Sequence, residues 1–241
     1  MKTLTFFIAI SLLALLAGCS TLSAAPVTAR VVDADTGEPL AGVAVMASWE
    51  LHEGSLYGHS PGCGAIDVEG AVTDANGEFH ILGWGPITVY GSCDMRGDNP
   101  SLILFKPGYD FEGMNNVPLN PVETVVVSRS RYDGKSIKLH RAADMDLKRK
   151  DVHSYAWDFS SLNDVIGRYV FADCNWKKIP DMLRAIYIQD QGFGTYQEFD
   201  NTITARLIRD DAAWQKAAPE CGSPKAFIEG LVKSQVPIAS P

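Results

Sequence analysis

Residues 71–82 read AVTDANGEFHIL, and this stretch decides the fold class of the first half of the chain. Two strand-like runs, 71–73 and 78–82, flank a turn that contains Asn76 and Gly77. An Asn-Gly pair between two such runs is a strong signal for a β-hairpin, because both residues tolerate the positive φ angles of the turn. The stretch therefore predicts antiparallel β-structure.

Similar short runs, rich in Val, Ile and aromatic residues, recur on both sides of this hairpin with turn-forming residues between them. Together with the hairpin they give about seven or eight strands across residues 27–141. Regular spacing of short strands indicates an antiparallel β-sandwich. The remaining runs are 27–32, 43–49, 87–90, 101–106, 123–128 and 136–140.

From Asp144 onward the apolar residues recur every three or four positions, which predicts amphipathic helices in residues 142–241. Ser160 or Ser161 is available to cap the first helix, and Pro180 suits the first turn of the second. We expect three to four helices, packed on each other and on one face of the sheet, and hence an α+β fold. The apolar stripes are Leu162, Val165, Ile166, Tyr169 and Val170; Ile179, Met182, Leu183, Ile186 and Tyr187; Phe199, Ile203 and Leu207; and Phe227, Ile228, Leu231 and Val232.

The first 18 residues have the build of a secretory signal peptide. Lys2 precedes an apolar run, residues 4–17, that is interrupted only by Thr5 and Ser11 and ends at a small residue. A membrane-spanning helix needs about 20 apolar residues, so the run is short for a retained anchor. We therefore expect export of the chain and removal of residues 1–18.

The end of this segment, Leu16-Ala17-Gly18-Cys19, resembles the lipobox of bacterial lipoproteins. The resemblance implies cleavage before Cys19, a diacylglyceryl thioether on its sulfur and acylation of the new amino group, with palmitate as the expected fatty acid. One chain holds a protein on a membrane marginally, whereas two or more hold it stably. An ordinary signal peptide with an unmodified cysteine is the alternative.

Ser20 follows the lipidation site. In Gram-negative lipoproteins, an aspartate at this position resembles a signal for retention in the inner membrane. The serine favours the outer membrane if the source is Gram-negative. Residues 19–26 are mostly small and polar, which predicts a lipidated tether without secondary structure. Removing residues 1–18 takes away Lys2 and changes the formal charge from −8 to −9. An acidic body disfavours a nucleic-acid partner, which requires a basic face.

Apart from Cys19, the chain has four cysteines, an even number that suits disulfides in an oxidising compartment. Four cysteines allow three connectivities. We predict Cys63 with Cys93 and Cys174 with Cys221, since each pair then falls within one segment of the chain. A metal site is the alternative, although the cysteines lack the spacings of known zinc motifs.

Residues 27–141 also resemble a known family. The resemblance is carried by residues 30–33, 36–43, 73–79 and 106–109. In order and combination they resemble the carboxypeptidase regulatory-like domain, a transthyretin-like or prealbumin-like β-sandwich. The resemblance covers about half of the chain and implies an accessory or binding module without catalytic activity. The stretch from His52 to Gly64 is an insertion relative to a minimal domain of this kind.

Two groups of polar residues are candidates for metal binding. His52, His59 and Cys63, with Glu53 nearby, belong to one long loop and have side chains that ligate zinc or copper, although solvated loop histidines explain them as well. A second group superficially resembles a calcium loop but lacks the further oxygen ligands of one, so turn chemistry is the simpler interpretation. This group consists of Asp33, Asp35 and Glu38.

No local signature of nucleophilic catalysis occurs in the chain, such as a GxSxG elbow. The basic run 148–150 is flanked by Asp146 and Asp151, which favours a solvated charged surface or linker. Trp157, Trp176 and Trp214 stand beside the helical stripes, where we expect core positions.

The sequence therefore predicts a non-catalytic lipoprotein of the bacterial envelope, without a cofactor, that binds a protein, peptide or glycan. The alternatives are an envelope hydrolase or metal-dependent enzyme that uses residues 52–64, and a purely structural lipoprotein.

Overall fold

The computed structural model describes residues 19–53, 62–116, 123–142, 152–171, 173–193 and 202–234, and these parts have the expected α+β fold. The strands are β1 (Cys19–Ala24), β2 (Val27–Asp33), β3 (Ala44–Glu53), β4 (Gly62–Val72), β5 (Glu78–Ile81), β6 (Trp84–Tyr90), β7 (Cys93–Met95), β8 (Ser101–Phe105), β9 (Glu112–Asn115), β10 (Val127–Ser128) and β11 (Ser136–Leu139). The helices are α2 (Val152–Val170), α3 (Pro180–Phe193), α4 (Ile203–Arg209), α5 (Asp211–Ala217) and α6 (Pro224–Lys233), with 3₁₀ turns η1 (Asn175–Lys178) and η3 (Pro219–Cys221).

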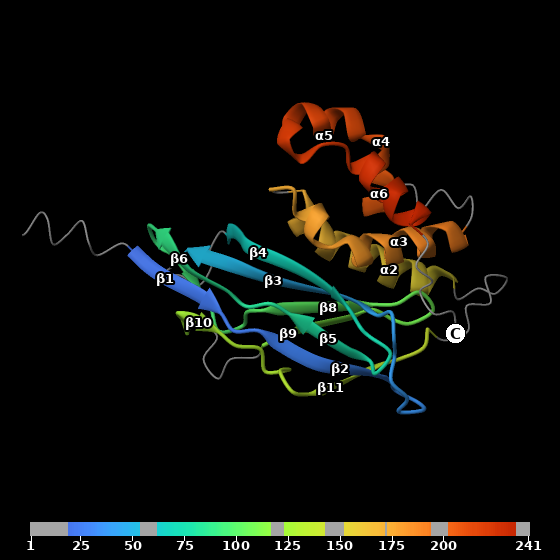
Figure 1. The fold of residues 1–241 in the computed structure, drawn as a ribbon, viewed down its shortest axis with the longest axis horizontal. Helices are drawn as coiled ribbons and strands as arrows, with labels where there is room; N and C mark the ends of the chain where they lie inside the picture. Colours follow the sequence, from blue (N-terminus) through green and yellow to red (C-terminus); the bar gives the residue numbers. More distant parts are fainter. Residues whose placement is uncertain are drawn as a thin grey trace, which may run out of the picture.

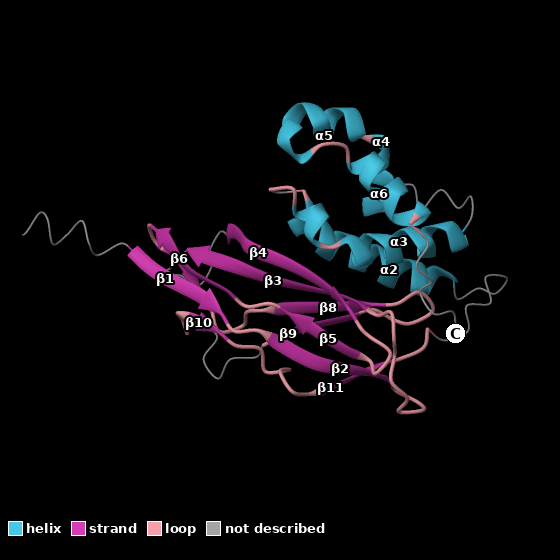
Figure 2. Ribbon diagram, viewed as in Figure 1, coloured by secondary structure: helices cyan, strands magenta, loops and turns pink. Residues whose placement is uncertain are grey.

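The strands form three sheets, and the helices gather on one side of them (Figures 1 and 2). The largest sheet has the order β4-β3-β8-β9, with β7 also paired to β3. Two three-stranded sheets, β11-β2-β5 and β10-β1-β6, share a core with it. The result is a sandwich with a helical layer on one outer face.

Strand β3 is the centre of the molecule because both of its faces are buried. Its run Ala44–Leu51 contains mostly apolar residues, with no alternation of polar and apolar positions. Such a run is typical of a strand that is covered on both sides. Val45, Ala47 and Trp49 face the core of the sandwich, whereas Ala44 and Met46 face the helices. One strand therefore contributes to two cores.

The helices do not form a core of their own but complete one on the outer face of the large sheet. Met46 of β3, Val68 of β4 and Phe105 of β8 belong to the same buried cluster as the apolar stripes of α2, α3, α4 and α6. The predicted packing of helices on one sheet face is confirmed. Residues 27–141 and 142–241 thus share a buried interface.

Residues 19–26, which we expected to be a tether without secondary structure, instead contain strand β1. This strand pairs antiparallel with β6 and parallel with β10. The prediction was wrong because Leu22 and Ala24 are 2% and 7% exposed and fill the sandwich core. Their period-two spacing continues through Val27 and Ala29, but the serines and threonine between them hide it.

The number of strands and the first helix also differ from expectation. Eleven strands occur in the described residues rather than about seven or eight, and the missed ones include β7 and β9, which are short. Helix α2 begins at Val152, so Ser160 and Ser161 are inside it and not at its N-terminus. Ser161 is exposed, a position at which serine is tolerated within a helix. Helix α5 had no predicted counterpart.

Helix α6 begins at a capping motif. The Ser223 hydroxyl accepts a hydrogen bond from the Ala226 backbone N–H at 3.0 Å, and Pro224 occupies the first turn. Pro180 likewise begins α3. Local capping chemistry thus determines where two of the helices begin.

The group Asp33, Asp35 and Glu38 forms a hydrogen-bonded turn, as its simpler interpretation predicted. Asp33 is 1% exposed and accepts hydrogen bonds from the backbone N–H groups of Asp35 and Thr36, both at 3.0 Å. Its other carboxylate oxygen accepts from the Tyr109 hydroxyl at 3.0 Å and from Arg141 Nε at 2.9 Å. These bonds, the one from Thr36 foremost, hold the pKa of Asp33 well below its usual range.

Candidate functional site

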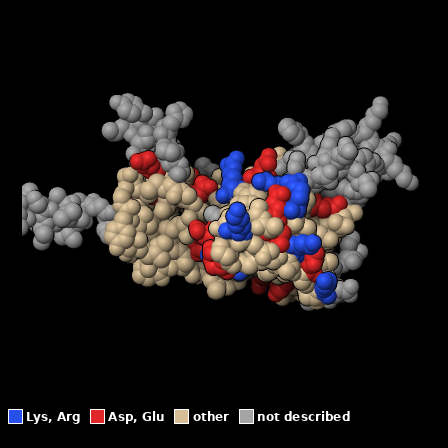
Figure 3. Space-filling model, turned by 90° about the horizontal axis from the view of Figure 1, so that it is seen from above, with Lys and Arg blue, Asp and Glu red and all other residues tan. Residues whose placement is uncertain are grey.

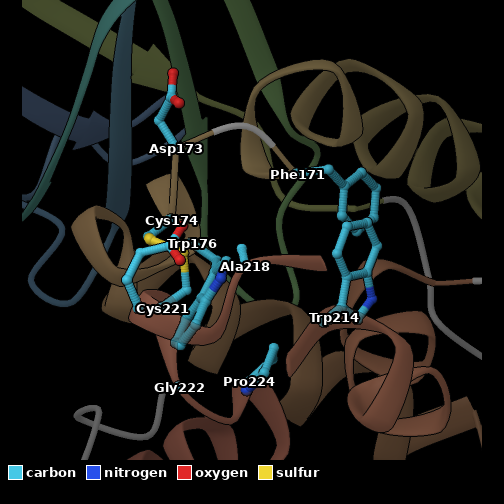
Figure 4. A pocket seen from close by; sticks show the side chains of 10 residues that line it. Phe171, Asp173, Cys174, Trp176, Trp214, Ala218, Cys221, Gly222 and Pro224 are labelled. Atoms are coloured by element: carbon cyan, nitrogen blue, oxygen red, sulfur yellow. A yellow bond between two sulfur atoms is a disulfide. The ribbon is translucent and has the colours of Figure 1, made fainter. Parts of the chain in front are cut away.

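A cavity of about 140 Å³ opens within the helical layer, between the end of α2 and the α5–α6 connection (Figure 4). Phe171 and Trp214 lie on one side of it, and the sulfurs of Cys174 and Cys221 lie on the other with Trp176. The cavity is lined by Phe171, Asp173, Cys174, Trp176, Trp214, Ala218, Glu220, Cys221, Gly222 and Pro224.

The aromatic walls are fixed by contacts between rings. Phe171 and Trp214 stack with centroids 4.8 Å apart and planes within 4° of parallel. Trp176 is 5% exposed and meets Phe227 edge to face at 4.9 Å. Such pairs stabilise by about 0.5–1.5 kcal/mol beyond their buried area, so the rings are held in place before any ligand arrives.

A disulfide between Cys174 and Cys221 forms part of one side of the cavity. It links the start of η1 to η3, which are 47 residues apart in the sequence. The backbone at Asp173 and Cys174 has φ angles of 49° and 57°, in the left-handed region that non-glycine residues rarely adopt. The bridge therefore holds a backbone conformation that is uncommon for these residues. The predicted pairing is present, as is Cys63 with Cys93.

Asp211 fixes the α5 side of the cavity relative to α6. Its Oδ1 accepts hydrogen bonds from the Ser223 hydroxyl at 2.8 Å and from the Lys225 backbone N–H at 3.0 Å. The Lys225 N–H is the largest cause of a lowered pKa at Asp211. The carboxylate is thus bound at the N-terminus of α6, where a negative charge is favourable.

Two exposed acidic residues, Asp173 and Glu220, line the cavity. The Glu220 carboxylate lies beside the Cys174 and Cys221 sulfurs, whereas the Asp173 carboxylate points away from the aromatic side chains (Figure 4). A desolvated aromatic face attracts cations, and adjacent negative charge strengthens that attraction. Two of the rings that line the cavity already have a cation of this chain over them: Arg206 lies over Phe171 at 4.6 Å and Lys177 over Trp176 at 5.3 Å. Glu220 and the Trp214 ring are therefore the parts of the cavity that suit a further small cationic group.

Glu220 also forms a possible metal-ligating group with Cys174 and Cys221, whose ligand atoms lie within 4.8 Å of one another. Both sulfurs are in the disulfide, however, and zinc binds the free thiolate. In the oxidised protein, Glu220 is therefore the one member of this group whose side chain can act as a ligand.

The described residues of the histidine-containing stretch 52–64, which we singled out in the sequence, do not line this cavity. His52 is on β3 opposite Asp94 of β7, and Glu53 is opposite Cys93. Cys63 of β4 is bonded to Cys93, so its sulfur is not a free thiolate ligand. His59 lies outside the described residues, as does the basic run 148–150.

The tryptophans that we expected in the core divide into two kinds. Trp176 is buried, as predicted, whereas Trp214 is half-buried and lines the cavity. The side chain of Trp157 lies outside the described part of the chain. Sequence reasoning missed the cavity as a site, although Phe171 and Trp176 stand within three residues of Cys174. Aromatic residues on both sides of a disulfide cysteine are the signal that was available.

Comparison with known proteins leaves the chain without an assigned family. No family model matches it, and a search of curated proteins gives no significant match. Chlorocatechol 1,2-dioxygenase from Pseudomonas putida aligns over 50% of this chain at 16% identity, with a TM-score of 0.26, and the match spans 60% of the dioxygenase. A 9R-lipoxygenase from Cyanothece aligns at 13% identity over 79% of this chain and 30% of its own, with a TM-score of 0.21. The resemblance to the carboxypeptidase regulatory-like domain stays a prediction.

Proposed function

We propose that the protein is a lipid-anchored, non-catalytic binding protein of the bacterial envelope, whose aromatic cavity holds a cationic group of a protein or peptide partner. The observation that carries the binding role is the Glu220 carboxylate beside aromatic walls in one pre-formed cavity.

The size of the cavity favours one side chain of a larger partner over a complete cofactor. Sites for small molecules usually have about 300–1,000 Å³, and each water in the liquid occupies about 30 Å³. The 140 Å³ present here suits the tip of a lysine or arginine. The acidic body, with a formal charge of −8 for the whole chain, attracts such a partner at long range.

The lipid anchor rests on the sequence Leu16-Ala17-Gly18-Cys19 at the end of an apolar run. Helices in the described parts of the chain are too short or too polar to cross a bilayer. A lipid on Cys19 is the means of membrane attachment that the sequence offers.

The binding role can be tested by NMR on the lipid-free body, residues 20–241, with Nα-acetyl-lysine amide as the cationic probe. We expect the indole N–H signals of Trp176 and Trp214 to shift with probe concentration. Glu220→Gln should raise the Kd several-fold because it removes one charge at the cavity. Glu229→Gln, an exposed change on α6 outside the cavity, is the matched control and should leave the Kd unchanged.

Nα-acetyl-leucine amide, which has no cationic group, separates charge recognition from general apolar binding. Equal shifts with the leucine and lysine probes would contradict the proposed specificity. Unchanged tryptophan signals at all lysine concentrations would refute the cavity as a binding site.

A further inference from the structure

Strand β1 has an outer face that is available to a partner. Leu22 and Ala24 point into the sandwich core, so alternate residues of β1 point outward. Residues directly opposite one another in neighbouring strands share a face. The register Cys19–Tyr90, Thr21–Thr88 and Ser23–Val127 therefore places these six positions on one surface, which we call the β1 outer face.

This face is uncharged and partly apolar. Strands β1, β6 and β10 contain no Asp, Glu, Lys or Arg. Tyr90 is 77% exposed and Val127 40% exposed, and the neighbouring Val126 is 64% exposed. In the view of Figure 3, the left end of the molecule, where Figure 1 shows β1 and β6, is almost free of charged side chains, whereas charges gather over the helical half.

Cys19 belongs to the β1 outer face, so a lipid on Cys19 would place this face next to a membrane. Since β1 begins at Cys19, no tether separates the proposed lipid site from the folded body. Tyr90 is the direct cross-strand neighbour of Cys19. A lipid chain on Cys19 that enters a bilayer therefore brings Tyr90 to the level of the headgroups.

The chemistry of the face suits that position. Tyrosine is enriched where proteins meet the membrane–water interface, because its ring is apolar and its hydroxyl is polar. An acidic body is repelled by anionic lipids, so the uncharged end is the one that approaches them at the lowest electrostatic cost. We propose that the β1 outer face lies against the lipid surface and fixes the orientation of the protein on its membrane.

This inference rests on the proposed lipid anchor, and the test distinguishes the two. The full chain, with the photoreactive residue p-benzoylphenylalanine in place of Tyr90, is produced in bacteria that process lipoproteins and is irradiated in the isolated membranes. A second variant has the same residue at Val127, and a control has it at Ile188, which is 40% exposed on α3 in the helical layer. All three positions are exposed, so the substitutions should not disturb folding.

We expect mass spectrometry to identify phospholipid adducts at positions 90 and 127 and none at position 188. Labelling of Cys19 by a radioactive fatty acid is measured in the same preparations. Absence of that label would refute the anchor itself. A labelled protein that crosslinks at position 90 to a second copy or to another protein, or that gives equal lipid adducts at position 188, would overturn the inference while the anchor stands.

Discussion

Asp190 on α3 should make the stability of the helical layer depend on pH. Burial raises its pKa from 3.8 to about 6, and hydrogen bonds from the hydroxyls of Thr204 and Thr202 on one carboxylate oxygen lower it only in part. The other oxygen, Oδ1, is buried without a partner among the described residues. Deprotonation therefore leaves a charge that the surroundings solvate incompletely.

The sign and size of the effect follow from the two pKa values. A carboxyl group with a raised pKa binds its proton more tightly in the folded state than in the unfolded chain. Its contribution to stability is fully present below pH 4 and is lost as the pH rises through 6. A shift of about two pKa units corresponds to about 3 kcal/mol at 1.36 kcal/mol per unit. For a protein of this size that is about 6–12 °C in Tm.

Urea unfolding of the wild-type body and of Asp190→Asn between pH 4 and pH 7.5 measures this contribution. We expect the wild type to lose about 3 kcal/mol relative to the variant over this range. The comparison is necessary because Asp33, Asp74 and Asp211 have lowered pKa values and make stability fall on acidification instead. Asp164→Asn, an exposed change on α2, controls for the altered net charge. Stability curves of wild type and Asp190→Asn that stay parallel across this range would show that the pKa of Asp190 is not raised.

Three further perturbations test the anchor and the architecture. Cys19→Ala should give an uncleaved precursor or release the protein from membranes, and a processed, membrane-bound variant in cell fractionation would contradict the lipid anchor. A variant that ends at Arg141 should aggregate or bind the dye ANS, because it exposes the apolar outer face of the large sheet; a soluble, cooperatively unfolding monomer would show that this face needs no cover. Replacing Cys174 and Cys221 by serine removes a constraint on 47 residues, worth about 4 kcal/mol by loop entropy, and should speed amide hydrogen exchange in α2–α6 before it does in the sandwich. Faster exchange in β2 and β3 first would contradict this order.

The strands that the sequence predicted are those in which local chemistry and tertiary position agree. The turn at Asn76-Gly77 and the runs that become β2, β3 and β8 were recognisable, because apolar pattern and turn residues indicate the same structure there. The β-hairpin predicted at this turn was wrong: β4 pairs with β3 and β5 pairs with β2, so the turn connects strands of two different sheets. Strand β1 was missed because serine and threonine occupy its outward positions, and a polar composition is also typical of a linker. Only its pairing with β6 and β10 distinguishes a strand from a tether, and pairing between residues so far apart in the sequence leaves no local trace.

The candidate site was predictable in its parts but not as a whole. Cysteine parity and the division of the chain predicted the bridge between Cys174 and Cys221, and helical periodicity marked the region of Trp176 and Trp214. The cavity depends on how α5 and η3 fold back over the end of α2, and α5 has no buried apolar stripe of its own. Periodicity cannot find such a helix, because its position depends on the disulfide and on Asp211.

The same fold-back places the cavity in the helical layer, whereas the β1 outer face belongs to the sandwich (Figure 1). Because the helices share a core with β3, β4 and β8, the two surfaces belong to one packed body without a linker between them in the described residues. A membrane contact that fixes the orientation of β1 therefore also fixes the direction in which the cavity faces. Without a tether, a partner must reach the cavity in that orientation, which restricts the geometry of binding but also reduces the rotational freedom that is lost on association.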